Sequence, residues 1–161
     1  MSAYWFDQAR VNDLLRLQGP RGTFFLRDMA GADLVFLATG TGIAPVKAML
    51  EGLKLVVRPE QPASISIYWG GRTREDLYWR PVVNDFGLRF VPVLSRADVT
   101  WKGARGYVQN VLLSDRPDTS KMLVYACGSD AMIHNANEQL RATGLPVKRF
   151  HSDAFVCSAV V

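Results

Sequence analysis

A short segment of this chain combines glycines, threonines and a proline in an order that could bind an anion. It follows the apolar residues 34–38 and consists of Thr39, Gly40, Thr41, Gly42, Ile43, Ala44 and Pro45. The apolar run predicts a buried strand, and Pro45 has the fixed φ that suits the start of a helix. Gly40 and Gly42 permit positive φ and let a ligand approach bare backbone. Because the amides and the dipole at a helix start attract negative charge, the segment predicts a phosphate-binding loop.

This glycine loop matches neither of the two best-known nucleotide-binding motifs. Gly40 and Gly42 are followed two residues later by Pro45 and not by a third glycine, and the next predicted strand does not end in an acidic residue. No Gly-Lys-Ser or Gly-Lys-Thr sequence follows either, so a Walker loop is excluded. The segment is therefore either a third kind of nucleotide loop or a tight strand-to-helix connection without a ligand.

The composition limits the kinds of protein that this chain can be. It has 161 residues, of which 48% are hydrophobic, so we expect one domain with a substantial core. The net charge is +4, but the 19 Lys and Arg residues are spread along the chain, which suits small acidic or phosphorylated ligands as well as nucleic acid. We favour the small ligand and expect no nucleic-acid partner.

Cysteine content and hydropathy predict the compartment of the protein. Cys127 and Cys157 are too few for a zinc or iron–sulfur site and do not resemble a disulfide framework. We therefore expect no metal site and a reducing, cytoplasmic setting. No segment has the roughly 18 consecutive apolar residues of a membrane span, and the first residues do not resemble a signal peptide, so we expect no membrane association.

Predicted strands and helices alternate along the chain. Expected strands cover residues 34–39, 65–69, 88–94, 122–126 and 147–150. Expected helices cover residues 45–55, 73–79, 107–113 and 130–141. Pro92 has no amide to donate to a ladder, so the third strand should lie at a sheet edge. The alternation predicts an α/β fold with a five-stranded parallel sheet flanked by helices.

Ligands of such sheets bind beyond the carboxyl ends of the strands, where this chain carries further small and polar residues. They are Gly70, Arg72, Ser95, Arg96, Cys127, Gly128, Ser129 and Asp130. Each also has an ordinary structural explanation: Arg72 as a solvated cation, residues 95–96 as a turn, and Cys127 as a small buried residue. His134 and His151 lack metal-ligand spacing and a nearby nucleophile, so we interpret both as structural.

Four of these segments, in this order and spacing, resemble the pyridine-nucleotide domain of the ferredoxin-NADP reductase family. They are residues 19–27 (GPRGTFFLR), 38–45 (ATGTGIAP), 68–72 (YWGGR) and 125–129 (YACGS). The ends of the chain, residues 5–6, 12–16 and 150–155, are similar to one branch of that family, the CDP-6-deoxy-Δ3,4-glucoseen reductases of 3,6-dideoxyhexose synthesis.

The resemblance implies a role for each segment in binding NADH or NADPH. Residues 39–45 would hold the pyrophosphate, and Arg72 and Arg96 would lie near the adenosine ribose. Ser95 with Arg96 resembles the pair that grips a 2′-phosphate in NADPH-using members, and a guanidinium suits such a phosphate. The branch that the chain resembles leans toward NADH, so the choice between the two cofactors stays open.

The resemblance also implies where hydride transfer would occur. Cys127 and Gly128 would lie beside the nicotinamide, where the cysteine would help to place its C4 atom against a flavin without acting as a nucleophile. Ser129 and Asp130, which follow, are further cofactor-binding candidates. Asp153 and Phe155 match the acidic and aromatic end of the family, near the flavin ring. The catalytic candidates are therefore Cys127, Asp153 and Phe155, in the sense that they orient cofactors.

The family carries an antiparallel FAD-binding barrel before this domain. We expect residues 1–28 to be a remnant of that barrel and residues 29–161 to form the NAD(P)H-binding domain, so the FAD site is incomplete and free FAD should bind weakly. The expected function is that of an NAD(P)H-dependent flavin reductase domain that passes hydride to a flavin, with a flavin domain or an iron–sulfur protein as partner. The alternatives are a nucleotide-binding module without turnover and a non-redox interaction domain. The final electron acceptor stays open.

The apolar residues of the predicted remnant would lack the rest of a barrel to pack against. They are Tyr4, Trp5, Phe6, Phe24, Phe25 and Leu26. We expect them to form an apolar patch that promotes a homodimer or the docking of a partner.

Overall fold

The computed structural model describes residues 4–16, 18–19, 22–57, 60–81 and 87–154. The strands are β1 (Asp33–Thr39), β2 (Ser64–Gly71), β3 (Arg89–Leu94), β4 (Ala104–Arg105), β5 (Met122–Gly128) and β6 (Phe150–Ala154). The α-helices are α1 (Ile43–Leu53), α2 (Val108–Ser114) and α3 (Asp130–Ala142). Short helical turns are η1 (Tyr4–Gln8), η2 (Gly40–Gly42), η3 (Arg74–Asp76) and η4 (Val147–Arg149).

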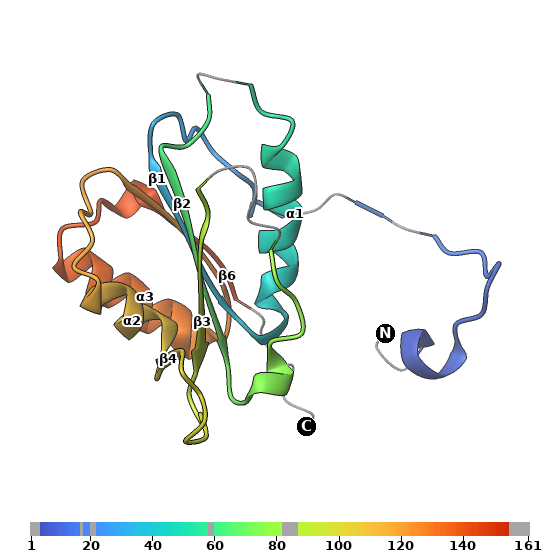
Figure 1. Ribbon diagram of the computed structural model, residues 1–161. Coiled ribbons are helices and arrows are strands. Elements are labelled where there is room, and N and C mark those ends of the chain that lie inside the picture. The colour runs from blue at the N-terminus through green and yellow to red at the C-terminus, as the bar shows by residue number, and fades with distance from the viewer. Residues whose placement is uncertain (1–3, 17, 20–21, 58–59, 82–86, 155–161) are drawn as a thin grey trace.

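All six strands form one parallel sheet with the order β4-β3-β2-β1-β5-β6 (Figure 1). The neighbours of β1 are β2 and β5. Strands β2 to β4 are therefore added in sequence on one side of β1, and after β4 the chain crosses to the other side, where β5 and β6 are added. A parallel sheet of this kind binds ligands at the carboxyl ends of its strands, near the point of that crossing. The fold class is the predicted one.

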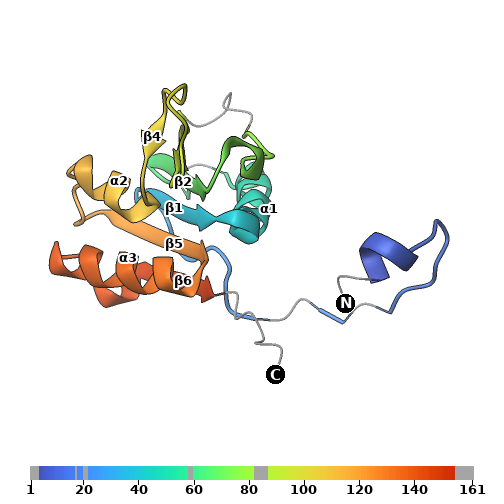
Figure 2. The same cartoon turned by 90° about the horizontal axis from the view of Figure 1, so that it is seen from below.

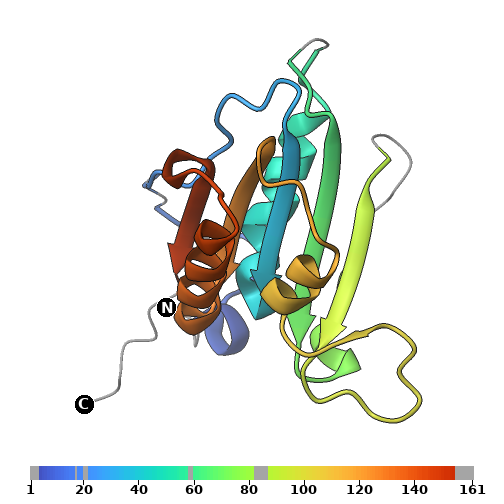
Figure 3. The same cartoon turned by 90° about the vertical axis from the view of Figure 1, so that its left-hand side faces the viewer.

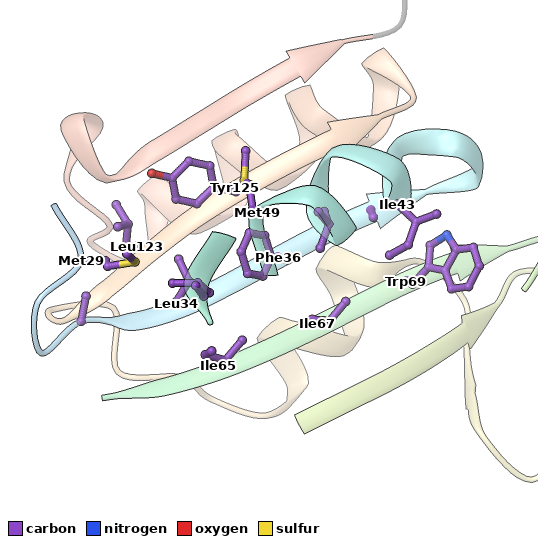
Figure 4. Packing of buried hydrophobic residues seen from close by; sticks show 14 residues of the cluster. Met29, Leu34, Phe36, Ile43, Met49, Ile65, Ile67, Trp69, Leu123 and Tyr125 are labelled. Carbon is purple, nitrogen blue, oxygen red and sulfur yellow. The ribbon is translucent and has the colours of Figure 1, made fainter. Parts of the chain in front are cut away.

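Alternating side chains on β1 divide the core into two layers. Leu34, Phe36 and Ala38 pack against α1, whereas Val35 and Leu37 pack against α2 and α3 on the opposite face. Figure 2 shows the sheet between α1 and the pair α2 and α3, Figure 3 shows α2 and α3 in front of the sheet, and Figure 4 shows the α1 layer in detail. The continuous apolar run in β1 follows from this burial on both faces.

The predicted count of five strands is wrong by one. The sixth strand, β4, has two residues that pair only with Val93 and Leu94 of β3, which is too short to give a periodic pattern in the sequence. Residues 89–92 of β3 therefore form the sheet edge themselves. The edge position predicted from Pro92 is confirmed for this part of the strand.

Two local predictions are also corrected. The helix expected over residues 73–79 is a single turn, η3. The Asp76 carboxylate accepts the amides of Arg72 and Thr73 at 2.7 and 3.0 Å and caps its start, but the turn ends at Leu77, whose φ of −95° and ψ of 63° lie outside the helical region. The strand expected over residues 147–150 begins only at Phe150. Residues 147–149 form the turn η4, in which the Arg149 amide donates to the Pro146 carbonyl at 2.9 Å.

The segment before β1 crosses the α1 side of the sheet. The Arg27 amide donates to the Tyr125 hydroxyl at 2.7 Å, and Phe24 meets the Tyr125 ring edge-on at 5.7 Å. Phe24 and Leu26 are partly buried there, whereas Phe25 is 52% exposed. The described part of residues 4–28 contains no strand, and its origin as a barrel remnant stays a prediction.

Some sequence-based expectations fall on residues outside this description. They concern the catalytic candidate Phe155, Cys157, and the side chains of Trp5 and Phe6. Within the described ranges, no helix combines the length and the hydropathy that a membrane crossing requires.

Candidate functional site

A cavity of about 840 Å³ opens at the carboxyl ends of β1, β2 and β5, beside the first turns of α2 and α3. This is the end of the sheet that the strand arrowheads mark in Figure 3. Eight of the residues predicted for the ligand site line this cavity: Thr39, Gly40, Thr41, Gly70, Arg72, Ser95, Gly128 and Ser129. Segments that are far apart in the sequence therefore meet where the parallel topology requires.

The glycine loop passes close to β5 and feeds a helix. Gly40 has a φ of +52°, as predicted, but Gly42 has a φ of −58° and is required for another reason: a Cβ there would overlap the carbonyl of Cys127. The Trp69 indole nitrogen donates to the Gly40 carbonyl at 3.0 Å and thereby anchors the loop to β2. The turn η2 runs directly into α1, so the positive end of the helix dipole lies next to the cavity.

A second glycine turn, at the end of β5, is fitted against the first. Gly128 has a φ of +132°, and a Cβ there would overlap Thr39. The Thr39 hydroxyl oxygen accepts the Ser129 amide at 2.9 Å, which ties the end of β1 to the start of α3. Thr39 therefore positions two loops that both face the cavity.

The ends of β2 and β3 form the opposite wall. Ser95 and Arg96 donate their amides to the carbonyls of Gly71 and Arg72 at 3.0 and 2.9 Å. Arg72 lines the cavity, whereas Arg96 does not. Asp76 also lines it, and the amides of Thr73 and Arg72 hold the pKa of this carboxyl below its usual value. The Arg72 guanidinium group and the Asp76 carboxylate therefore belong to the same wall of the cavity.

Sequence reasoning missed the residues that α2 and α3 contribute. These are mainly Tyr107, Gln109, Asn110, Met132, Asn135 and Gln139. Gln109 is only 5% exposed, and its side-chain oxygen has no hydrogen-bond partner within the described residues; the same holds for the side-chain oxygen of Gln139. The available signal was a glutamine in a predicted helix whose positions 108, 111, 112 and 113 are apolar, because a buried amide normally has partners.

The remaining predicted residues lie around the cavity and do not line it. Ile43, Ala44 and Pro45 form the first turn of α1, in which Pro45 is the third residue, and Asp130 begins α3 with its side chain exposed. Pro45 remains compatible with the helix because amides of a first turn have no intrahelical acceptor.

Cys127 and Asp153, two of the catalytic candidates, are paired residues on the neighbouring strands β5 and β6. Cys127 is fully buried, while Asp153 is exposed. Burial, with the nearby Asp153 charge as a second cause, raises the pKa of the Cys127 thiol to about 11. The thiol therefore stays protonated at neutral pH, which agrees with a packing role and not with a nucleophile.

The residues of the cavity fit a dinucleotide. Gly42 and Gly128 let the two loops pack closely at the edge of the cavity, the start of η2 and α1 favours a phosphate, and Arg72 can pair with another anion. The unpartnered side-chain oxygen of the buried Gln109 can accept a hydrogen bond from a polar base, beside the exposed ring of Tyr107. Among the described residues, no group of three or more His, Cys, Asp or Glu side chains could hold a metal ion.

Fold and site together define a nucleotide-binding α/β domain, and comparison with known proteins gives its family. The model of the oxidoreductase NAD-binding domain matches residues 36–138. The chain belongs to this family, the pyridine-nucleotide domain of ferredoxin reductase-like oxidoreductases. The predicted family is thereby confirmed, and the dinucleotide of the family is NADH or NADPH.

Individual relatives narrow the resemblance. A CDP-6-deoxy-L-threo-D-glycero-4-hexulose-3-dehydrase reductase of Yersinia pestis is 42% identical over 158 residues, which cover 95% of this chain and 46% of the relative. Protein RfbI of Salmonella typhimurium is 35% identical over 98% of this chain and 48% of the relative. The crystal structure of a cytochrome P450 reductase of Amycolatopsis has a TM-score of 0.82 at 25% identity, over 96% of this chain and 47% of that structure. The chain spans about half the length of these relatives.

Proposed function

We propose that this chain is the NAD(P)H-binding part of a flavin-dependent electron-transfer reductase, similar to the CDP-hexulose dehydrase reductases. The observation that carries the proposal is the cavity at the carboxyl ends of β1, β2 and β5, in which two tightly fitted glycine turns meet at a helix start. The 42% identity to the Yersinia pestis reductase supports the choice of reductase.

The glycine loop and the wall opposite to it bind the two charged parts of the cofactor. Gly40 and Thr41 lie next to the positive helix end and hold the pyrophosphate. Arg72 faces the ribose of the adenosine half, where it can pair with a 2′-phosphate. Tyr107 supplies a ring for stacking of the base, and the buried Gln109 amide reads its polar edge.

The end of β5 orients the reacting half. Gly128 lets the end of β5 pack against Thr39 at the edge of the cavity, and the buried Cys127 and the adjacent Asp153 fix the shape of that end of the sheet. Bound NAD(P)H supplies a hydride that a flavin accepts. The part of this chain is to hold the nicotinamide in a defined orientation, which lowers the entropic barrier of the transfer.

Asp76 and Arg72 supply opposite preferences for the two cofactors. A carboxylate near the ribose accepts hydrogen bonds from the 2′-hydroxyl of NADH and repels the 2′-phosphate of NADPH, whereas Arg72 attracts that phosphate. Because Ser95 and Arg72 line the same wall, both cofactors fit, and the balance between Asp76 and Arg72 sets the preference.

The physiological partner is a flavin domain within the same reductase or a separate iron–sulfur protein. A cytoplasmic location fits this proposal, because the buried thiol of Cys127 needs no oxidising compartment. We infer that residues 1–28 connect to the flavin domain and that the exposed side chains of the N-terminal segment, such as Val11 and Leu14, contact a partner or a second copy.

The test is a titration of the purified chain with NADH and, in parallel, with NADPH, followed by quenching of tryptophan fluorescence. Trp69 is a direct reporter because its indole is bonded to the glycine loop. We expect saturation in the micromolar range for at least one cofactor. Binding of neither below millimolar concentration, in a chain shown to be folded by circular dichroism, would exclude the proposed function.

A second assay separates a reductase domain from a binding module. Added FAD and ferricyanide report whether the chain passes electrons from NADH to an acceptor. Turnover above that of the free flavin supports the reductase. Tight NADH binding without any such turnover would assign the chain the role of a nucleotide-binding module.

A further inference from the structure

A second cavity, of about 390 Å³, lies at the other end of β5 and β6 and has no part in the proposed function. Leu123 near the start of β5 and His151 near the start of β6 line it, together with Ala30 and Ala32 before β1. The dinucleotide cavity, by contrast, contains Gly128 at the last position of β5. Figure 3 shows the segment before β1 and the turn before β6 together at this end of the sheet, opposite to the arrowheads.

The rim of this cavity carries excess positive charge. Arg27, Lys148 and Arg149 line it, against a single carboxylate, Asp28. None of the ion pairs within the described residues involves these three cations. The Asp28 carboxylate accepts the Ala30 amide at 3.2 Å, so part of its hydrogen-bonding capacity is already used in a turn. The cavity therefore has two unbalanced positive charges.

Part of this rim is held in place without a ligand. The Arg27 guanidinium lies over the Phe25 ring at 4.1 Å and donates to the Thr23 carbonyl at 3.0 Å, while its backbone amide is anchored on the Tyr125 hydroxyl. His151 stacks against Tyr125 at 5.0 Å, and burial, followed by the charge of Arg27, lowers its pKa. A charge held in a fixed geometry binds an anion with a smaller entropic cost.

The floor of the cavity is apolar. The buried side chains of Leu123 and Ala32 form it, and Figure 4 shows Leu123 next to Met29. A concave site with an apolar floor and a cationic rim suits a small organic anion better than the flat surface of a protein partner. Both guanidinium and ammonium groups bind phosphate and carboxylate oxygens.

We propose that this second cavity binds a small organic anion with at least two negative charges, of the phosphate or carboxylate type. The anion would bridge Arg27, on the segment that precedes β1, and Arg149, on the turn that precedes β6. Because the two segments are 122 positions apart in the chain, the bridge would stabilise the folded domain and raise its melting temperature.

The experiment is calorimetric titration of the chain with inorganic pyrophosphate and, separately, with citrate, at constant ionic strength. We expect saturable binding of at least one probe, and the tighter of the two identifies the type of anion. The variant K148Q/R149Q should weaken that binding at least tenfold. K148Q alone changes only an exposed side chain and should weaken it at least threefold. Failure of both probes to bind the unmodified chain would overturn the proposal.

Two controls separate this site from the dinucleotide cavity and from bulk charge. Excess NADH should leave the binding of the probe unchanged, and complete displacement by NADH would place the probe in the dinucleotide cavity and overturn the proposal. The variant K54Q/K102Q removes the same charge from exposed positions outside both cavities. An equal loss of binding in that variant would show net charge alone to be the cause and would also overturn it. The melting temperature of each variant reports folding without relying on NADH.

Discussion

Replacement of Gln109 by methionine should change stability and cofactor binding in opposite directions. The Gln109 side chain is buried, and its oxygen has no partner among the described residues. An unpaired buried polar group costs about 1–3 kcal/mol of folding free energy. Methionine keeps nearly the same volume without that group. The free energy of unfolding of Gln109→Met should therefore rise by about 1 kcal/mol or more, which raises the melting temperature by about 2–4 °C per kcal/mol.

The same substitution should weaken NADH binding. A neutral hydrogen bond contributes about 0.5–1.5 kcal/mol net, so its loss raises the Kd about 2- to 12-fold. The reduced hypoxanthine analogue of NADH lacks the exocyclic amine of adenine. If the Gln109 amide reads that amine, the unmodified chain should discriminate between the two dinucleotides, and Gln109→Met should bind both alike.

Thermal denaturation and fluorescence titration of the same preparations provide the two measurements. Gln61→Met is a matched control, because the Gln61 amide does have a partner, the Val56 carbonyl at 2.9 Å. That variant should lose stability and keep its affinity for NADH. A lower melting temperature of Gln109→Met with unchanged NADH affinity would refute the reasoning, since it would show that Gln109 has a structural role alone.

Three further predictions concern the glycine turns, the buried thiol and the choice of cofactor. The variant Gly128→Ala should lose about 1–3 kcal/mol of stability and most NADH binding, because Gly128 has a positive φ and a Cβ there would overlap Thr39. Urea denaturation measures the stability and titration measures the binding. Gly52→Ala, where a Cβ would meet open space, is the control. The pKa of the Cys127 thiol is raised in the folded chain, so the contribution of the thiol to stability is complete below its usual pKa near 9 and is lost as the pH rises toward about 11. The difference in unfolding free energy between the unmodified chain and Cys127→Ala should therefore shrink over that pH range. A constant difference would contradict the raised pKa. Asp76→Asn should raise the affinity for NADPH relative to NADH at least fivefold, whereas an unchanged ratio in parallel titrations would show that Asp76 acts only in capping the η3 turn.

Strong local patterns gave most of the fold from sequence. The apolar run of β1, the helical spacing in α1 and α3, and the glycine at the end of α3 each predicted their element to within a few residues. The errors fall where a tertiary contact decides. The two residues of β4 form a strand only because β3 lies beside them, and Leu77, which packs against the α1 layer of the core, leaves the helical region after one turn.

The parallel α/β class and the two glycine turns could be predicted from sequence, because the alternation of strand and helix patterns and the small residues at strand ends are visible without knowledge of tertiary contacts. Which residues line the cavity depends on contacts between distant segments, so the structure was needed to identify them. It placed Tyr107 and Gln109 in the cavity and left Arg96 outside it. It also showed that Gly42 is required by the nearby Cys127 carbonyl and not by its φ, a contact between segments 85 positions apart that no local pattern records.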